Sequence, residues 1–198
     1  MANDQRYASP AELKSALGIS DTTDDRRIGA VLDAISRAID EHCGWRFYTT
    51  DSDESRYYTA EYTDVFYCVD PIVSLTTLAT DSDADRTWGT EWESTDYDLM
   101  PFNAEADGEP YRWIETTPDG DYPFVTVAKG LKLTGTFGWP SVPDQIREAT
   151  LLCAEKLFKR KDAVFGVMGV TELGIVQKII REDSELALLL SGDLVRRF

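Results

Sequence analysis

The stretch IGAVLDAISRAIDEHCGWRF, residues 28–47, carries the strongest fold signal in the chain. Its apolar side chains recur at the three- and four-residue spacing of one helix face. Charged side chains occupy the opposite face, as expected where a helix meets water. N-cap candidates lie at 20–23, and Gly44 is suited to end a helix. The pattern predicts one long amphipathic helix that buries Ile28, Val31, Leu32, Ile35, Ala38, Ile39 and Cys43.

A shorter helix is predicted on the N-terminal side. The residues Ser9-Pro10-Ala11-Glu12 form a capping box with proline at the first helical position. The Ser9 hydroxyl can accept a backbone N–H, and the Glu12 side chain can reach back to the cap. Gly18 is suited to end this helix.

The C-terminal part of the chain is also predicted to be helical. Pro143 fits the first turn of a helix that runs to about residue 162. Apolar residues cover most of the girth of this helix, which predicts burial on two sides. We expect one side to contact a neighbouring subunit through Leu151, Leu152 and Phe158. Asp183 is expected to cap a last short helix through residue 190.

The segment between these helices has strand composition, with short β-branched and aromatic runs separated by turn residues. Residues 131–137 alternate cleanly, with Leu131 and Leu133 expected to point inward. The fold class is therefore α+β: a helical bundle of N- and C-terminal helices with a β-rich antiparallel insert. We expect a single domain, 1–198, with a helical core at 9–45 and 143–198 and an insert at 46–139. The strands are predicted at 46–50, 56–59, 65–69, 72–78, 97–100, 112–115, 124–127 and 131–137, as a small sheet or open barrel.

The charge of the chain is concentrated in that insert. The 198 residues contain 36 acidic and 20 basic side chains, for a net charge of −16. Residues 51–124 alone hold 19 acidic and 3 basic groups. This balance argues against a duplex-DNA binder and against docking on anionic membranes. No apolar run approaches the roughly 18 residues of a membrane helix, and no signal-peptide core is seen at the start.

Residues that could carry chemistry are few. His42 is the only histidine, and we expect it to pack or cap at a helix end. Three scattered cysteines are no disulfide framework and no zinc site, and they suggest folding in a reducing compartment. The turn Asp81-Ser82-Asp83-Ala84-Asp85 resembles the start of a calcium loop. Arg86 and Trp92 stand where an EF-hand needs glycine and glutamate, so a solvated acidic turn is favoured over a weak Ca²⁺ or Mg²⁺ site. No catalytic residue, metal ligand or cofactor is therefore assigned.

Several segments follow one another in a distinctive order. They are 13–25, 28–47, Gly138-Trp139-Pro140-Ser141-Val142-Pro143 with 146–150, 157–167, and 183–190 with the basic tail that follows. This order resembles the head-to-tail connector (adaptor) proteins of long-tailed phages and related tailed viruses. The acidity of the insert departs from the pattern of that family.

The resemblance implies a structural virion protein without catalysis. About twelve copies would form a ring beneath the portal protein, in the neck of a virion assembled from chains made in the host cytoplasm. The ring would extend the channel for genome DNA, without sequence-specific binding, and would present a surface to the next neck protein. In connectors the C-terminal segment docks on the portal, so the resemblance implies that portal binding here involves Leu194, Val195, Arg196, Arg197 and Phe198.

Three other functions are kept as alternatives. The chain could be another neck component, a stopper or tail-completion protein, although those are expected to be mostly β. It could also be a soluble enzyme with carboxylate or metal chemistry in the insert, or a non-viral α+β binding module. Divalent-metal binding would favour the enzyme, and a gene position away from any portal gene would favour the binding module.

Overall fold

A computed structural model describes residues 5–159 and 183–191. The chain divides into two compact units. The first, here the helical unit, comprises Met1–Phe47 and Val142–Phe198. The second, the sheet unit, is Tyr48–Ser141. Helices and an antiparallel sheet are both present, so the α+β prediction is confirmed.

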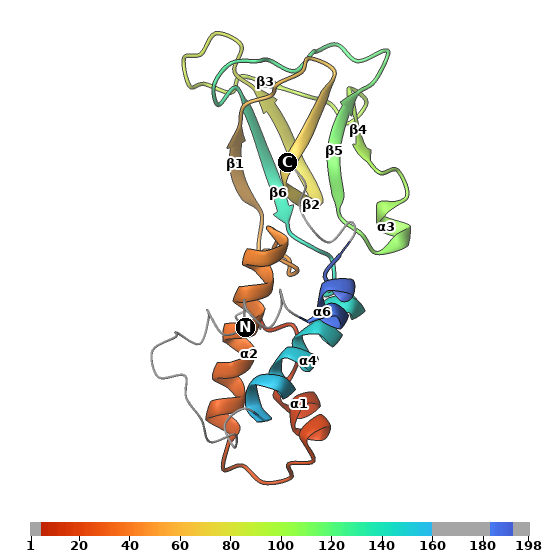
Figure 1. Cartoon of the computed structure of the whole chain (residues 1–198). Helices are drawn as coiled ribbons and strands as arrows, with labels where there is room; N and C mark the ends of the chain where they lie inside the picture. Colours follow the sequence, from red (N-terminus) through yellow and green to blue (C-terminus); the bar gives the residue numbers. More distant parts are fainter. Residues whose placement is uncertain (1–4, 160–182, 192–198) are drawn as a thin grey trace. The chain divides into compact units, whose positions relative to one another are not determined.

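The helical unit contains α1 (Pro10–Leu17), α2 (Asp25–Cys43), α4 (Asp144–Lys159) and α6 (Ser184–Leu189) (Figure 1). The capping box of α1 is confirmed, because the Ser9 hydroxyl accepts from the Glu12 N–H and the Glu12 carboxylate accepts from the Ser9 N–H. Gly18 and Gly44 end α1 and α2 with φ of 70° and 73°, the left-handed conformation that glycine adopts without strain. The expected helix ends follow from these local signals.

The core of the helical unit lies where α2 packs against α4, with α1 touching both and α6 touching α4. The predicted apolar face of α2 is buried along its whole length. The buried residues of α4 include several small side chains between Ile146 and Phe158. The buried residues of α4 are Ile146, Ala149, Thr150, Cys153, Ala154 and Phe158.

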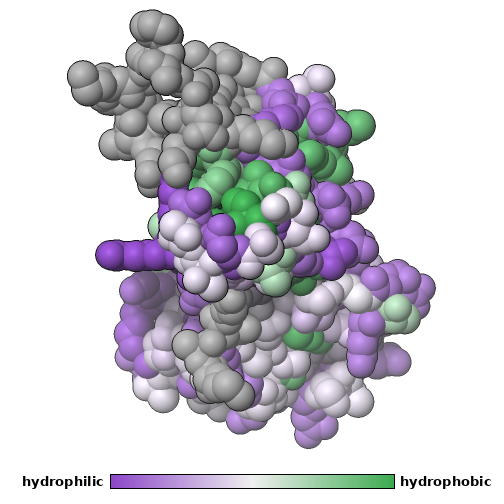
Figure 2. Space-filling model, turned by 90° about the horizontal axis from the view of Figure 1, so that it is seen from below, coloured by the Kyte–Doolittle hydropathy of each residue, from purple (hydrophilic) through white to green (hydrophobic). Residues whose placement is uncertain are grey.

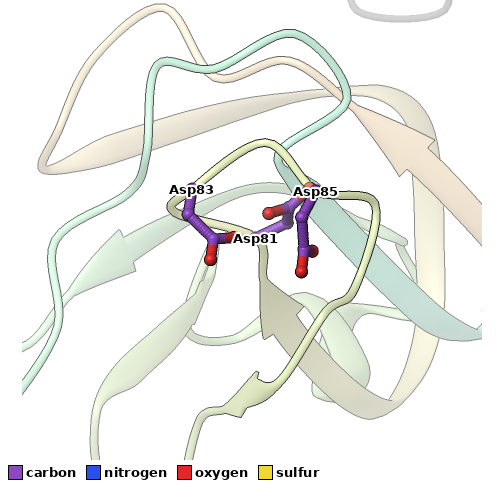
Figure 3. A group of neighbouring side chains, drawn as sticks. All are labelled: Asp81, Asp83 and Asp85. Atoms are coloured by element: carbon purple, nitrogen blue, oxygen red, sulfur yellow. The ribbon is translucent and has the colours of Figure 1, made fainter.

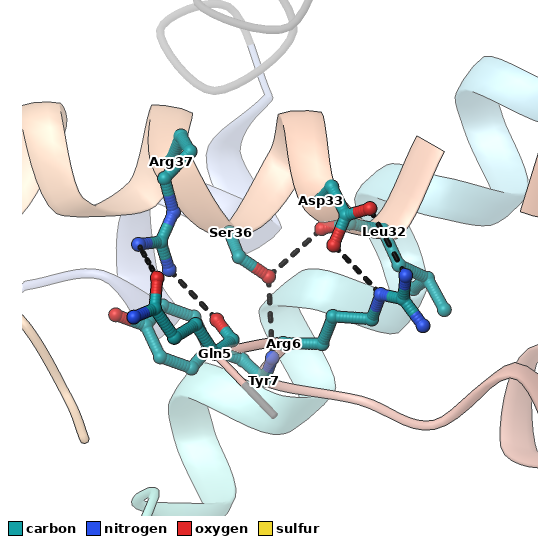
Figure 4. A network of polar contacts seen from close by, with 7 residues as sticks. All are labelled: Gln5, Arg6, Tyr7, Leu32, Asp33, Ser36 and Arg37. Carbon is teal, nitrogen blue, oxygen red and sulfur yellow. Dashed lines mark hydrogen bonds and ion pairs between the residues drawn. The ribbon is translucent and has the colours of Figure 1, made fainter. Parts of the chain in front are cut away.

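The segment before α1 lies across α2 and is held there by polar contacts (Figure 4). The Arg6 guanidinium forms two bonds to the Asp33 carboxylate, at 2.7 and 3.0 Å. The Tyr7 N–H donates to the buried Ser36 hydroxyl at 3.2 Å, and the Arg37 side chain donates to the backbone carbonyl of Gln5 at 2.7 Å. We call residues 5–7 the strap. Local sequence patterns do not predict it, because its partners lie about 30 residues away in the chain.

The Tyr7 side chain joins the strap to the C-terminal end of α2 and to the residues that follow it. Its hydroxyl donates to the Asp40 carboxylate and accepts from the Phe47 N–H at 3.0 Å. The Tyr7 and Phe47 rings meet edge to face, with centroids 5.8 Å apart. Burial raises the pKa of Asp40, against the opposing effect of the Tyr7 hydrogen bond. The burial of Asp40 therefore favours the protonated form of its carboxyl group, although the Tyr7 hydroxyl stabilises the ionised form.

The sheet unit is one antiparallel sheet in the order β1-β6-β2-β5-β4, with β3 paired to β2 (Figure 1). A short helix, α3 (Ala104–Asp107), follows β4. The strands are β1 (Glu54–Tyr58), β2 (Val65–Thr80), β3 (Thr90–Glu91), β4 (Tyr97–Met100), β5 (Tyr111–Thr116) and β6 (Leu131–Phe137).

Two strand predictions were wrong, and two correctly predicted strands are joined into one. Residues 46–50 are not a strand, because Phe47 is buried in the helical unit and its N–H is used by Tyr7. Residues 124–127 are not a strand either; Phe124 is fixed instead by stacking on Trp92, with centroids 4.9 Å apart. The segments 65–69 and 72–78 form the single strand β2, in which the register shift between residues 67 and 72 accommodates the intervening proline.

The alternation predicted for β6 is confirmed, since Leu131, Leu133, Gly135 and Phe137 are buried and the residues that alternate with them are only half-buried. Gly135 continues the inward row where β6 lies between β1 and β2. A Cβ at this position would lie 2.1 Å from the Ser74 carbonyl oxygen. At Gly135 the backbones of β6 and β2 are therefore so close that a residue with a side chain would not fit without movement of the backbone.

Replacing Gly135 with alanine is expected to lower the free energy of unfolding by about 1–3 kcal/mol, because backbone must move to admit the methyl group. Urea denaturation of the purified variant measures this. Gly89→Ala is the matched control, because an added Cβ there meets no atom within 4 Å. Equal stability of the two variants would contradict the close approach.

Replacing Tyr7 with phenylalanine is expected to cost about 1–3 kcal/mol at neutral pH, because the Phe47 N–H and the Asp40 carboxylate both lose a buried partner. Loss of the Tyr7 donor raises the native pKa of Asp40 further. The stability difference from wild type should therefore shrink as the pH falls through that raised pKa, where Asp40 is protonated in both proteins. Urea denaturation across this pH range, with Tyr62→Phe on the exposed surface as control, tests both expectations.

Candidate functional site

The predicted subunit-contact residues all lie on α4, but in different surroundings. Leu151 and Leu152 are half-buried and keep part of their surface accessible. Phe158 is buried within the chain, and the Arg27 guanidinium of α2 lies over its ring, 4.9 Å from the centroid. Leu151 and Leu152 are therefore the two of the three that retain surface for a contact with another molecule.

The predicted portal-binding residues, 194–198, lie outside the described residues, as do 160–182. The helix that precedes the tail is described and is firmly attached. The Asp183 carboxylate caps α6 by accepting from the N–H groups of Glu185 and Leu186, at 3.1 and 3.3 Å. Lys156 of α4 also donates to it, which holds the pKa of Asp183 below its ordinary value. The C-terminal tail thus follows a helix that is fixed to α4.

A polar groove lies between α1 and α2, with a volume of about 610 Å³. Two ion pairs cross it, Arg6 with Asp33 and Lys14 with Asp25, the second with Nζ and Oδ1 2.6 Å apart. Arg26 also lines the groove. Because most of these charges are already neutralised by each other, the groove has no strong preference for an anion or a cation.

A stripe of large side chains crosses the sheet unit, in which Tyr62 and Tyr67 are exposed and Met100 and Trp113 are half-buried. Tyr67 of β2 pairs with Trp113 of β5, which in turn pairs with Met100 of β4. Residues opposite one another in antiparallel strands share a face. Tyr67 is 62% exposed, and Tyr62 contacts it edge to face at 6.3 Å. We call Tyr62, Tyr67, Met100 and Trp113 the outer stripe.

The two units differ strongly in charge. The sheet unit contains 19 acidic and 5 basic side chains, against 17 and 15 in the helical unit. Two of the basic side chains form ion pairs within the sheet unit: Arg56 pairs with Glu54 and Asp70, and Arg112 pairs with Glu109. The excess of acidic over basic side chains makes the surface of the sheet unit acidic. Figure 2, which views the molecule from below Figure 1, shows a hydrophobic patch surrounded by mostly hydrophilic side chains.

The acidic turn between β2 and β3 brings three carboxylates together (Figure 3). One oxygen from each of Asp81, Asp83 and Asp85 lies within 4.8 Å of the others. Asp81 is buried and the other two are exposed. Burial opposes ionisation of Asp81, but several hydrogen bonds to its carboxylate, the strongest from the Arg86 N–H, together outweigh burial and hold the pKa of Asp81 below its ordinary value. Sequence reasoning favoured a fully solvated turn and missed the burial of Asp81.

The remaining candidates are His42 and the three cysteines. His42 lies exposed in the last turn of α2, at the helix end where it was expected. Cys43, Cys68 and Cys153 are free and buried, and burial raises the pKa of each thiol above its ordinary value. Over the described residues, no helix is both long enough and apolar enough to cross a membrane.

Sequence reasoning also missed the outer stripe. Its signal was the alternation in 65–69, where Phe66 and Cys68 are buried and Tyr67 points outward. Alternation alone does not show which strands lie beside one another. The stripe is therefore visible only once the register of β2, β5 and β4 is known.

No protein-family model matches the chain, and no curated protein matches it. Solved structures do share its fold. A chain in the neck of an empty gene transfer agent (GTA) particle, computed with C6 symmetry, matches with a TM-score of 0.50 and 17% identity. The match covers 90% of this chain and 91% of that one. A chain in the virion of a native GTA particle matches with a TM-score of 0.50 and 16% identity, over the same shares of each chain. The chain therefore has a fold that occurs in the neck of a GTA particle.

Proposed function

We propose that the chain is a structural protein of the virion neck in a tailed, phage-like particle. The observation that carries the proposal is the shared fold with a chain of a GTA neck, which extends over 90% of the present chain. The order of helical segments that resembles phage connectors supports the same assignment independently. No catalytic step is part of this function.

Within the neck, we place the chain as the connector beneath the portal. In this proposal residues 1–198 are one connector domain. The helices at 9–45 and 143–198 form a bundle that makes the ring, and the insert at 46–139 is the acidic sheet. About twelve copies join the capsid to the tail. The six-fold symmetry used for the GTA neck is compatible with such a ring.

The surfaces of the chain support a ring. A cyclic ring with head-to-tail contacts needs two unlike surfaces on each copy, because each copy meets its neighbours through different faces. The helical unit offers Leu151 and Leu152 on α4, and Leu188 of α6 is 75% exposed. The sheet unit offers the outer stripe. Contacts through apolar surface of this kind release water and drive association.

The charge of the sheet unit supports passage of DNA without binding. Each phosphate contact requires a lysine or arginine, and clustered contacts create strong non-specific affinity. With 19 acidic and 5 basic side chains, the sheet unit repels phosphate instead. Genome DNA can therefore move past the ring without being retained.

The direct test is assembly on the portal. The purified chain is mixed with portal rings from the same genome, and the complex is imaged by cryo-electron microscopy. We expect a symmetric collar of about twelve copies on the tail side of the portal. Portal alone is one control, and the chain lacking residues 194–198 is the other. The truncated chain should keep its melting temperature but add no collar.

Several outcomes would contradict parts of the proposal. A collar formed equally well by the truncated chain would remove the portal-binding role of Leu194–Phe198. No added density, with both proteins folded, would exclude the connector position. Density that appears only after another neck protein is bound would favour the stopper or tail-completion alternative.

Changing Leu151 and Leu152 to serine is expected to weaken ring assembly, by about 1–3 kcal/mol per site where each side chain is buried in the contact. Sedimentation of the chain on portal rings, at several concentrations, measures the change. The melting temperature of the unassembled variant must be recorded, since both leucines are half-buried in the chain itself. Phe102→Ser controls for a general loss of apolar surface, because Phe102 is 66% exposed and belongs to neither proposed contact surface. Unchanged assembly of the double variant would show that this face of α4 is not a subunit contact.

A further inference from the structure

The acidic turn between β2 and β3 holds negative charge at unusually close range. One carboxylate oxygen from each of Asp81, Asp83 and Asp85 lies within 4.8 Å of the other two. Figure 3 shows all three side chains on the same turn. Like charges at this separation oppose one another unless a cation lies among them. Acidic groups on a surface are common, so this proximity alone does not make a site.

A second observation concerns the buried carboxylate. Asp81 is only 1% exposed. Its Oδ2 accepts a hydrogen bond from the Arg86 N–H at 2.9 Å. Its Oδ1 is shielded from solvent and has no hydrogen-bond partner. A buried carboxylate oxygen without a partner is unfavourable, and such groups are normally satisfied by a donor, an ordered water or a cation.

The side chains around the turn do not neutralise it. Among residues 5–159 and 183–191, none forms an ion pair with the three carboxylates. Arg86, which is nearest in sequence, donates its guanidinium to the Ala128 carbonyl instead. The turn therefore combines three convergent carboxylates with an unsatisfied buried oxygen and no basic partner.

We propose that Asp81, Asp83 and Asp85 bind one Ca²⁺ ion. Calcium takes six to eight hard oxygen ligands in flexible geometry, of which carboxylates are the commonest side-chain donors. Water would complete the shell on the exposed side, where Asp83 and Asp85 lie. The site differs from an EF-hand, because its sixth and twelfth positions are Arg86 and Trp92. With three carboxylates and an open side, its dissociation constant falls at the weak end of calcium sites, about 0.1–1 mM.

Binding at this point would tie two segments of the sheet unit together. The Asp81 N–H donates to the Gly130 carbonyl at 2.8 Å, and the Trp88 indole N–H donates to the Lys129 carbonyl at 3.1 Å. A cation bound by the carboxylates would restrict the motion of the turn, and the two hydrogen bonds would pass this restriction to the loop at 127–130. The inference does not depend on the neck assignment, because it rests on this turn alone.

The test is isothermal titration of the full-length chain with CaCl₂ in 0.15 M NaCl, where weak counterion condensation is screened. We expect one ion per chain and a rise in melting temperature with Ca²⁺. In the Asp83→Asn/Asp85→Asn variant the affinity should fall at least about tenfold, since two charged ligands are lost. Without calcium, this variant should be as stable as wild type or more so, because repulsion is relieved.

The matched control is Asp107→Asn/Asp119→Asn, which makes the same charge change at two other exposed positions of the sheet unit. Its calcium affinity should equal that of wild type. Equal losses in both variants, or binding without defined stoichiometry, would identify general attraction to an acidic protein and overturn the site. Binding of MgCl₂ in preference to CaCl₂ would overturn the choice of ion.

Discussion

The packing of α2 against α4 is the contact on which the rest of the structure depends. The two helices are separated by the whole sheet unit in sequence, yet their buried faces form the core of the helical unit. The apolar face of α2 and the buried residues of α4, including Ala149 and Ala154, are both shielded from solvent, and Arg27 of α2 lies over the Phe158 ring of α4. Because this contact joins chain segments on both sides of the insert, the sheet unit can vary in charge and surface without altering the helical core.

The separation of the chain into a helical unit and an acidic sheet unit explains how one chain can combine assembly with a strongly acidic surface. The helical unit is nearly balanced in charge, and apolar surface remains on α4 and α6. The sheet unit carries almost all of the excess negative charge, together with the outer stripe. Long-range repulsion between acidic surfaces opposes non-specific association, so contacts between copies must come from complementary local surfaces. In the proposed neck ring, the same negative charge repels the phosphates of DNA and so prevents the DNA from binding to the ring.

Local signals explain most of what the sequence predicts correctly. The capping box at Ser9, the stop at Gly44 and the alternation of β6 each lie within a few residues of the element they determine. The errors come from long-range contacts. Phe47 and Phe124 look like strand residues, but each is fixed by a ring from a distant segment, Tyr7 and Trp92 respectively. Likewise, the burial of Asp81 depends on a turn packing against the loop at 127–130, which sequence spacing does not reveal.

The most direct test of the central claim is the copy number of the chain in purified particles. Quantitative mass spectrometry, with isotope-labelled peptides of this chain and of the portal protein, gives their molar ratio. A neck connector predicts the chain in particles at a ratio near one to one with the portal protein, and absent from empty proheads without a tail. A chain that is abundant in the lysate but missing from particles, or present at the level of a capsid protein, would contradict the assignment.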